Sequence, residues 1–395
     1  MSRIVLLTRA YLNSRSANAT CAFNVFEALR CYGHEVIIIS YENTEANPSE
    51  GRVQIISKKE ARAESKGIGS RALGFLKLIN GKVDQLIDRS IVDLYIEKML
   101  QLEADSPFDA IVSFMFPLET VQAAAEFKKK NPRIRTVVYE LDSTGDGIVQ
   151  SHFPFFYNRT VKSWLNGVYL FFDSIIIMKS HKEYWKNQFG KRFGRKMRIA
   201  DIPVLKEHFG LDNNVDQKVM MVYSGVLDKK YRSPSFLLEV LEYLKKDNDF
   251  EFVFFSKGDC EKEIAKKAIL VSEIKQKGYV KESELESYLL RATILVSIGN
   301  TKSKSVPSKI IHYMSFGKPI IHFSSQRKDV CKEYFSNYPL ALVVDQSRGV
   351  RKTSSIISEF IAEVKGRTVS FNEVRKSLYM SDPMYSAEII LGDLL

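Results

Sequence analysis

Residues 294–323 read ILVSIGNTKSKSVPSKIIHYMSFGKPIIHF and contain one complete strand, loop, helix and strand unit. The apolar run 294–298 predicts a buried parallel strand, and the polar residues 299–305 predict a loop. Pro307 is tolerated in a first helical turn because its missing N–H would have no partner there. From Ser308 onward, apolar residues recur at helical spacing until the glycine before KPII, which suits a helix stop. The segment therefore predicts a strand-to-helix crossover.

The start of this helix has the chemistry of an anion site. The first amides of a helix have no carbonyl partner within it, and the helix dipole adds positive charge at the same end. The amides of Ser308 and Lys309, together with the Lys309 ammonium, would therefore suit a diphosphate. The alternative is a crossover that begins with proline for structural reasons and holds no ligand.

Length and composition indicate a globular chain of two domains. At 395 residues the chain exceeds what one hydrophobic core usually supports. The sequence has no uncharged apolar run of about 18 residues, so we expect no membrane-spanning helix. We also expect no signal peptide before the strand that begins near Ile4. The four cysteines lie far apart without metal-ligand spacing, which predicts free, mostly buried thiols in a reducing compartment: Cys21, Cys31, Cys260 and Cys331.

The net charge of +11 is concentrated in one segment. Residues 151–200 contain ten Lys or Arg and only two acidic residues, Asp173 and Glu183. Aromatic residues lie between these cations, a pattern that suits an anionic lipid surface or nucleic acid. The stretch 73–102 is also amphipathic and basic, as in a helix on a bilayer surface. The alternatives are a solvated basic face for the first segment and packing against a sheet for the second.

The first half of the chain alternates strands with helices, which indicates a parallel sheet covered on both faces. The expected strands are 4–8, 36–40, 53–57, 110–114, 136–141 and 174–179, and the expected helices are 22–31 and 118–129.

The second half repeats the pattern after a linker around Pro203, so the fold class is α/β, with two doubly wound Rossmann-like domains facing each other across a crevice. We expect residues 1–202, joined by a terminal helix at 384–395, to form the first domain and 203–383 the second. The expected strands are 218–223, 251–255, 271–275, 294–298, 320–323 and 341–344, and the expected helices are 234–245, 261–268 and 282–291.

Several short motifs carry a resemblance to a known family: VPSK at 306–309 with YM at 313–314 and GKPII at 317–321, YSGVL at 223–227 with YRSP at 231–234, and GHEVI at 33–37. In these motifs the sequence resembles the retaining GT-B glycosyltransferases, group 1-like, that build bacterial surface polysaccharides. The resemblance covers nearly the whole chain. It implies that the first domain receives the acceptor and the second binds a nucleotide-sugar donor.

The resemblance also implies a donor site. Gly225, in the first loop of the second domain, would let the backbone approach the phosphates, and Arg232 would offer a guanidinium fork to their oxygens. Ser308 and Lys309 would bind the same diphosphate from the helix start. The other implied residues are Tyr279 and Val280 near the base, Asn300 near the sugar, and Ser16, Ala17 and Asn18 in a small-residue loop after the first strand.

One pair of positions departs from the family pattern. Many relatives have two glutamates eight residues apart, of which the second holds the donor ribose, whereas this chain has Lys304 and His312 at the matching places. A histidine can hydrogen-bond a diol, but it does not offer the two acceptor oxygens of a carboxylate. For His312, a helix position that faces the surface is the alternative.

The catalytic chemistry implied by the resemblance depends on the leaving group. If the departing diphosphate takes the acceptor proton, a retaining transfer needs no protein nucleophile, and the cations carry most of the catalysis. Relatives place a polar residue after the fifth strand, where Asp142 matches best and Glu140 second, although an Asp there is as often a cap or turn residue. The sequence has no DxD pair in the expected context, so we expect no metal and no cofactor beyond a UDP- or GDP-linked sugar as co-substrate.

The sequence thus predicts a glycosyltransferase that moves a sugar to a saccharide acceptor at the cytoplasmic face of the cell membrane, and we expect this acceptor to be lipid-linked. Its expected partners are the donor, the acceptor and an anionic membrane surface. One alternative is a nucleotide-sugar epimerase of the same fold, which needs a water-activating carboxylate or histidine pair beside the sugar. The other is a nucleic-acid-binding protein that uses residues 151–200, although no recognised binding module is present.

Overall fold

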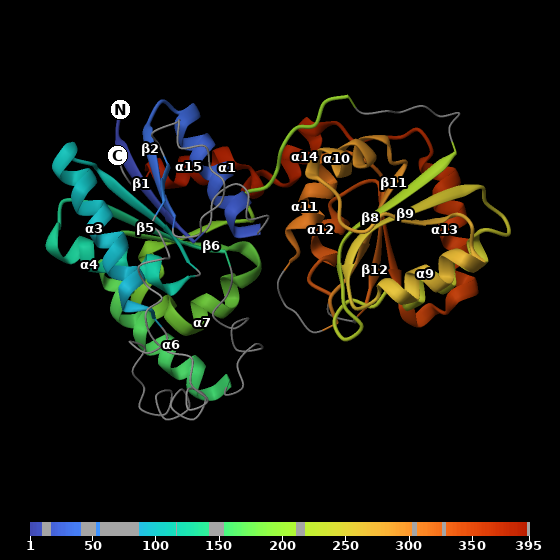
Figure 1. The fold of residues 1–395 in the computed structure, drawn as a ribbon, viewed down its shortest axis with the longest axis horizontal. Coiled ribbons are helices and arrows are strands. Elements are labelled where there is room, and N and C mark those ends of the chain that lie inside the picture. Colours follow the sequence, from blue (N-terminus) through green and yellow to red (C-terminus); the bar gives the residue numbers. More distant parts are fainter. Residues whose placement is uncertain are drawn as a thin grey trace. The chain divides into compact units, whose positions relative to one another are not determined.

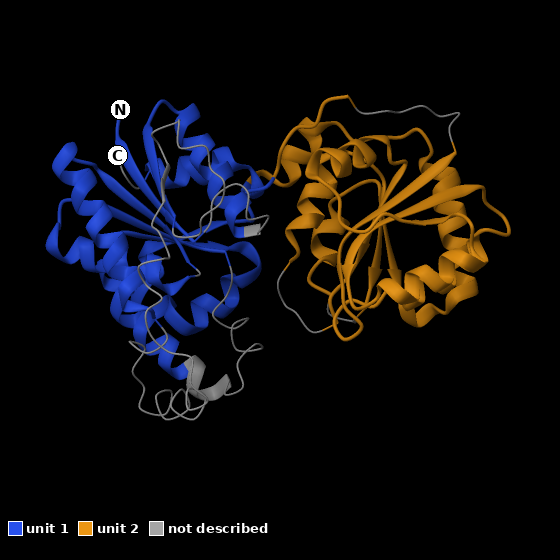
Figure 2. Ribbon diagram, in the orientation of Figure 1, with its two compact units in different colours: residues 1–204, 380–395 blue, residues 205–379 orange. Residues whose placement is uncertain are grey.

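The structure is a computed structural model that describes residues 1–9, 17–40, 53–55, 87–115, 117–141, 154–210, 218–301, 306–325 and 329–392. The chain forms two compact units (Figure 2): unit 1 is residues 1–204 with 380–395, and unit 2 is residues 205–379. From the sequence we expected the chain to pass from the first domain to the second after residue 202 and to return before residue 384. Both boundaries between the units lie within a few residues of these positions.

Unit 1 is built on a parallel sheet of seven strands in the order β3-β2-β1-β4-β5-β6-β7. Alternate residues of each strand point to opposite faces, and both faces are apolar because helices cover both. The strands are β1 (Arg3–Thr8), β2 (Glu35–Ser40), β3 (Val53–Ile55), β4 (Ala110–Phe114), β5 (Arg135–Glu140), β6 (Ser174–Met178) and β7 (Met197–Ala200).

One face of this sheet carries the larger part of the core. Residues such as Val5, Ile111 and Ile175 point to it, and the apolar faces of four helices pack against them. These helices are α3 (Arg89–Asp105), α4 (Leu118–Lys130), α6 (Pro154–Val168) and α7 (Lys182–Phe193). Short 3-10 turns at Tyr169–Phe171, Lys179–His181 and Gly194–Lys196 connect α6, β6, α7 and β7.

The opposite face is covered by two helices from distant parts of the chain. Helix α1 (Ala17–Cys31) packs beside α15 (Pro383–Gly392), as Figure 1 shows. The hydroxyl of Tyr139 on β5 lies 2.9 Å from that of Ser386 on α15, and both residues are buried. The terminal helix therefore completes unit 1, as the resemblance led us to expect.

Unit 2 has a second parallel sheet, in the order β10-β9-β8-β11-β12-β13. Its strands are β8 (Val219–Leu227), β9 (Phe250–Gly258), β10 (Ile274–Gln276), β11 (Ile294–Ile298), β12 (Ile320–Ser324) and β13 (Ala341–Asp345). Its helices are α8 (Ser235–Leu244), α9 (Glu261–Leu270), α10 (Glu282–Arg291), α11 (Ser308–Ser315), α12 (Lys332–Ser336), α13 (Val350–Val364) and α14 (Phe371–Ser377). Two further 3-10 turns lie at Gln346–Arg348 and Tyr379–Ser381.

Four local expectations were wrong. Helix α1 begins at Ala17 rather than at residue 22, and strand β8 continues through Gly225 to Leu227 rather than ending in a loop at Tyr223. The strand expected at 271–275 is displaced, because Val271 ends α9 and only Ile274–Gln276 pairs with β9. Strand β7, at the edge of the first sheet, was not predicted.

The basic segment 151–200 proves to be part of the unit 1 core. Leu165, Tyr169 and Phe172 are buried, as are Trp185, Phe189 and Phe193 of α7. Trp164 is half-buried and donates to Gln122 at 2.6 Å. The described aromatic residues that suggested a binding surface are therefore mostly packing residues, while several cations of α7 and the turn after it stay exposed: Lys186, Lys191, Arg192 and Arg195.

Two other expectations concern the whole chain. All four cysteines are free, and all but Cys31 are buried, which confirms the prediction. Within the described residues, no helix has both the length and the apolar character needed to span a membrane.

Candidate functional site

The strongest candidate site lies in unit 2, where β8 and β11 end and α11 begins. Lys309 is in the first turn of α11, and its Nζ lies 3.4 Å from the Ser224 hydroxyl of β8. A Cβ atom on Gly225 would come within 3.2 Å of the same Nζ, and Gly225 has a φ of 153°, which favours glycine. The glycine therefore leaves room for the ammonium group beside the strand, although it belongs to β8 and not to a loop.

Arg232 is held next to this lysine by a neighbouring loop. Its Nε and Nη2 both donate to the Oδ1 of Asn300, at 3.1 and 2.7 Å, and Asn300 lies just beyond β11. The adjacent Thr301 donates its amide to the Tyr231 carbonyl at 2.9 Å. The segment after β8 and the segment after β11 are thus fastened together, and the structure brings Gly225, Arg232, Asn300 and Lys309 into one place.

A buried tyrosine fixes the strand beneath these cations. The Tyr313 hydroxyl accepts a hydrogen bond from the Ser224 amide at 2.7 Å and lies 3.0 Å from the Ser224 hydroxyl. Burial raises the pKa of Tyr313, so the phenol stays protonated and neutral. Tyr313 therefore ties α11 to β8 and fixes where Lys309 meets Ser224.

The electrostatics of the site favour an anion. Burial, followed by the positive charge of Arg232, lowers the pKa of Lys309 from 10.5 to about 8. Among the described residues, no carboxylate forms an ion pair with Lys309 or Arg232. Two cations close together in a partly buried place are unfavourable unless an anion joins them. The first amides of α11, at Ser308 and Lys309, add to the same positive potential.

Two residues expected near the base follow β10. Tyr279 is 58% exposed, and the Lys257 ammonium lies 4.9 Å from the centre of its ring. Val280 is half-buried. Both residues belong to the loop at the carboxyl end of β10, the edge of the sheet where this fold type binds ligands.

His312 is half-buried on α11, within a small aromatic cluster. Its ring lies 5.5 Å from that of His208 and 5.2 Å from that of Phe316. Burial, followed by the charges of His208 and Lys309, lowers the pKa of His312 to about 3. The imidazole is therefore neutral at physiological pH, and it can accept or donate a hydrogen bond but cannot attract an anion. Lys304, the other departure from the family pattern, lies outside the described residues.

The candidates in unit 1 are only partly described. Glu140 ends β5 and is buried, and its Oε1 lies 3.3 Å from the Trp185 indole nitrogen. Burial raises the pKa of Glu140 to about 8 against the opposing effect of that hydrogen bond. Ala17 and Asn18 belong to the first turn of α1 and not to a loop. Asp142 and Ser16 lie outside the described residues.

One cluster in unit 2 was missed by the sequence reasoning. His322 and Asp329 form a fully buried pair, with His322 Nε2 2.9 Å from Asp329 Oδ2. These two side chains and the Cys331 thiol could in principle hold a metal ion, since their ligand atoms all lie within 4.8 Å of one another. However, the Asp329 carboxylate is already bonded to His322 and, at 2.9 Å, to the Cys331 amide. We therefore assign the cluster no metal. The only signal in the sequence was a histidine within an apolar strand.

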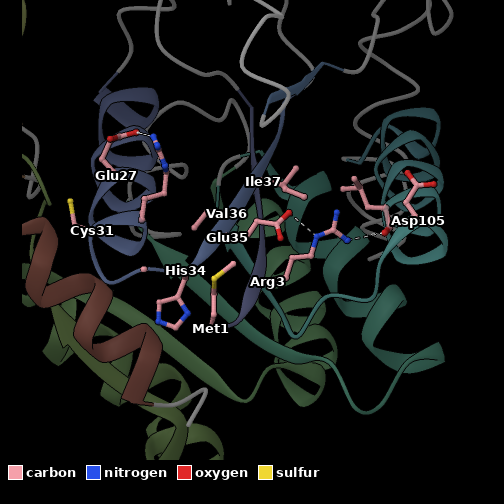
Figure 3. Close-up of a pocket in the computed structure, with 12 residues that line it drawn as sticks. Met1, Arg3, Glu27, Cys31, His34, Glu35, Val36, Ile37 and Asp105 are labelled. Atoms are coloured by element: carbon pink, nitrogen blue, oxygen red, sulfur yellow. Dashed lines mark hydrogen bonds and ion pairs between the residues drawn. The ribbon is translucent and has the colours of Figure 1, made fainter.

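A separate cavity of about 800 Å³ lies in unit 1, at the amino ends of β1 and β2 (Figure 3). Arg3 donates to Glu35 at 2.9 Å and Arg30 to Glu27 at 2.8 Å, so these four charges neutralise one another. Ligands of doubly wound sheets bind at the opposite, carboxyl ends of the strands. We therefore place the candidate site in unit 2 and not in this cavity.

A comparison with protein-family models matches a large part of unit 2. Residues 218–347 match the family model described as Glycosyl transferases group 1. This range contains Gly225, Arg232, Asn300 and Lys309. A comparison with curated protein sequences gives no match.

Solved structures resemble the chain over nearly its full length. The lipopolysaccharide outer core galactosyltransferase WaaB has a TM-score of 0.57 at 11% identity, with 99% of each chain covered. The HepE protein of Anabaena, solved with UDP-glucose, has a TM-score of 0.60 at 11% identity, with 99% of this chain and 100% of that chain covered. The UDP-GlcNAc 2-epimerase of Neisseria meningitidis, solved with UDP-GlcNAc, has a TM-score of 0.59 at 11% identity, with 99% and 98% covered.

At such low sequence identity these structures show the fold alone, and the family match concerns residues 218–347 of unit 2. The expected resemblance to GT-B glycosyltransferases and the expected α/β fold of two Rossmann-like domains are confirmed, while retention stays a prediction. The chain has the GT-B fold of two Rossmann-like domains, and its residues 218–347 match the family model of the glycosyl transferases group 1.

Proposed function

We propose that this protein transfers a sugar from a nucleotide-diphosphate sugar to a lipid-linked saccharide during the assembly of a cell-surface polysaccharide. The observation that carries the proposal is the pair Lys309 and Arg232. Both cations lie at the carboxyl edge of the second sheet, beside the start of α11, and neither is neutralised by a carboxylate among the described residues. A diphosphate supplies the charge, the size and the acceptor oxygens that this arrangement requires.

The chemistry follows from where negative charge develops. When the bond between the sugar and the diphosphate breaks, charge accumulates on the leaving diphosphate oxygens. Lys309, Arg232 and the first amides of α11 would stabilise that charge more strongly than the charge of the bound donor, which accelerates the reaction. In a retaining transfer the same diphosphate would take the proton of the acceptor hydroxyl, so that no protein nucleophile is needed.

The neighbouring residues would orient the rest of the donor. Neutral His312, on the same helix as Lys309, would hydrogen-bond the ribose, and the loop with Tyr279 and Val280 would lie against the base. Asn300 would contact the sugar while it holds Arg232. In unit 1, Glu140 ends β5 with a carboxyl group whose pKa burial raises to about 8, so at neutral pH it would serve as a hydrogen-bonding group and would leave the acceptor proton to the departing diphosphate. For Asp142, two residues further on in the sequence, we keep the proposal that it acts near the reacting carbon.

The lipid-linked acceptor suggests that unit 1 works at the inner face of the cell membrane. The exposed cations Lys186, Lys191, Arg192 and Arg195 support this proposal. Each cation near an anionic leaflet contributes about 1 kcal/mol, so four suffice for reversible binding. The nucleic-acid alternative loses support, because most of the described aromatic side chains of segment 151–200 are buried and cannot stack on bases.

The proposal is tested first by ligand binding. A thermal-shift screen against UDP, GDP, ADP and their sugars should identify the donor, since a ligand at 100 times its dissociation constant stabilises the protein by about 2.7 kcal/mol. Arg232→Ala and Lys309→Ala should each cost roughly 1.5 to 3 kcal/mol in transition-state stabilisation. Lys262→Ala, which removes an exposed lysine of α9, is the matched control and should leave turnover unchanged. Intact turnover in both site variants would refute the donor site.

The epimerase alternative is separated by the product. The Neisseria meningitidis epimerase shares the fold, so the fold alone does not choose between the two reactions. A transferase releases nucleoside diphosphate only as the acceptor gains a sugar, and the anomeric configuration of that product, measured by NMR, shows whether the transfer is retaining. An epimerase instead produces an altered sugar without any acceptor.

A further inference from the structure

We propose that the buried His322–Asp329 pair is a positioning device for Arg232, which acts through the backbone of Gly299 and the side chain of Asn300. This inference rests on the function proposed above, because it explains how the guanidinium is held ready for a diphosphate. His322 is on β12 and Asp329 precedes α12, so neither residue needs to touch the ligand.

The pair has a fixed geometry. His322 is fully buried and the Asp329 side chain is 2% exposed. While one imidazole nitrogen meets Asp329, the other, Nδ1, lies 3.1 Å from the Ser297 hydroxyl, and Ser297 pairs directly with His322 in the β11–β12 register. Burial has the largest single effect and would raise the pKa of Asp329, but the hydrogen bond with His322, the charge of His322 and the hydrogen bonds with Cys331 together outweigh it and hold the pKa at about 2. An ionised carboxylate at such depth stays where its partners hold it, because moving it from them is costly.

Gly299 rests directly on this pair. A Cβ atom at position 299 would lie 2.6 Å from Asp329 Oδ2 and 3.2 Å from His322 Nε2, so any side chain there would collide with the pair. The Gly299 amide donates to the Phe323 carbonyl at 2.9 Å, and its carbonyl accepts from the Ser325 hydroxyl at 2.9 Å. The backbone that ends β11 is therefore held by hydrogen bonds and by close packing together.

The next residue passes this constraint to the candidate site. Asn300 directly follows Gly299, and its Oδ1 accepts both hydrogen bonds from Arg232. A displacement of Gly299 would move the side-chain oxygen Oδ1 of Asn300 and release the guanidinium of Arg232. Arginine binds a diphosphate well only when its planar fork is presented in the correct orientation. The pair thus affects the ligand through Arg232, without contact of its own.

A double-mutant cycle separates this role from a general effect on folding. The dissociation constants of UDP and GDP are measured by calorimetry for the wild type, Gly299→Ala, Arg232→Ala and the double variant. We expect Arg232→Ala to weaken binding about 10-fold to 100-fold and Gly299→Ala about 10-fold. In the Arg232→Ala background, Gly299→Ala should weaken binding less than about 2-fold, because the group through which it acts has been removed.

Two further variants protect the test. Asp329→Asn keeps the volume of the side chain and removes its charge, so it serves if Gly299→Ala does not fold, and its effect should likewise vanish without Arg232. Ile357→Ala removes buried volume from α13, which contributes no residue to the pair or to the described contacts of Arg232, and it should lower the melting temperature without changing the UDP or GDP affinity. Equal weakening by Gly299→Ala in both backgrounds, or no weakening in the wild type, would overturn the proposal.

A ligand-free measurement distinguishes this inference from the proposed function. Hydrogen exchange of the Arg232 Nε–H, followed by NMR, should be slow in the wild type and faster in Gly299→Ala and Asp329→Asn. If none of UDP, GDP and ADP binds the wild type, the proposed function fails, and the exchange rates still decide whether the pair positions Arg232. Unchanged exchange in both variants would contradict the positioning role even if the nucleotides bind.

Discussion

Replacing Lys309 with methionine should make the ligand-free protein more stable while it abolishes tight binding of a nucleoside diphosphate. The ammonium is partly buried beside Arg232 and gains only a long contact to Ser224, at 3.4 Å, in return. Methionine fills a similar volume without a charge. A residue kept at the expense of stability is typical of a functional site.

The size of the effect follows from the pKa of Lys309. The fall in pKa from 10.5 to about 8 corresponds to roughly 3 to 4 kcal/mol at about 1.4 kcal/mol per pKa unit. Because the side chain keeps some contact with solvent, we expect about 2 kcal/mol, which raises the melting temperature of a unit of this size by roughly 4 to 8 °C. Below pH 8 the lysine is charged in the folded and the unfolded chain, so the folded protein bears the full cost. As the pH rises from 8 to about 10.5, the folded protein loses this proton first and the cost disappears.

The assay is calorimetric unfolding of the wild type and Lys309→Met at pH 7 and pH 10, with the transition of unit 2 followed separately if the two units unfold apart. The stability advantage of Lys309→Met should be largest at pH 7 and nearly gone at pH 10. Lys262→Met, at an exposed position of α9, should show no such dependence. An advantage of the same size at both pH values, or a loss of stability at pH 7, would refute the argument that the Lys309 charge is poorly compensated.

Three other outcomes are expected. Glu140→Gln should remove a loss of stability that the wild type shows as the pH rises from about 4.5 to 8, because over this range the carboxyl stays protonated in the folded protein, where its pKa is about 8, but ionises in the unfolded chain and stabilises it; parallel denaturation curves of both proteins over this range would contradict the assignment. His312→Ala should weaken binding of UDP or GDP several-fold but leave binding of inorganic pyrophosphate unchanged, because a ribose contact is absent from the smaller ligand; equal losses for both would place His312 at the phosphates. Co-sedimentation with liposomes should require anionic lipid and fall steeply with salt, and equal binding to neutral vesicles would show that the exposed cations of α7 have no such role.

The sheets could be predicted because their strands are buried on both faces. Runs such as Ile294–Ile298 are apolar at almost every position, so their identity as parallel strands does not depend on tertiary context. Strand β7 lies at the edge of its sheet and has Arg198 in its middle, so its sequence lacks that signal. The start of helix α1 at Ala17 was not predicted, because residues 17–20 are small or polar and their composition indicates a loop.

The site could be predicted only where the ligand chemistry has a local pattern. Lys309 and Ser308 were found because a helix start after proline has recognisable residues. The partnership of Arg232 with Asn300 joins residues 68 apart in sequence, and no periodicity indicates it. The His322–Asp329 pair was missed for a different reason, because a histidine in an apolar strand usually reads as a core residue, and its partner follows seven residues later in a loop.

The last helix of unit 1 has a consequence for how the chain is made. Protein synthesis delivers residues 205–379 in full before it delivers Met380 and the residues of α15. Unit 2 can therefore close its sheet on the ribosome while α1 and Tyr139 still lack the helix that covers them. During that interval an apolar face of unit 1 is open to chaperones, proteases or a second nascent chain, and a chain truncated near residue 380 would leave that face uncovered.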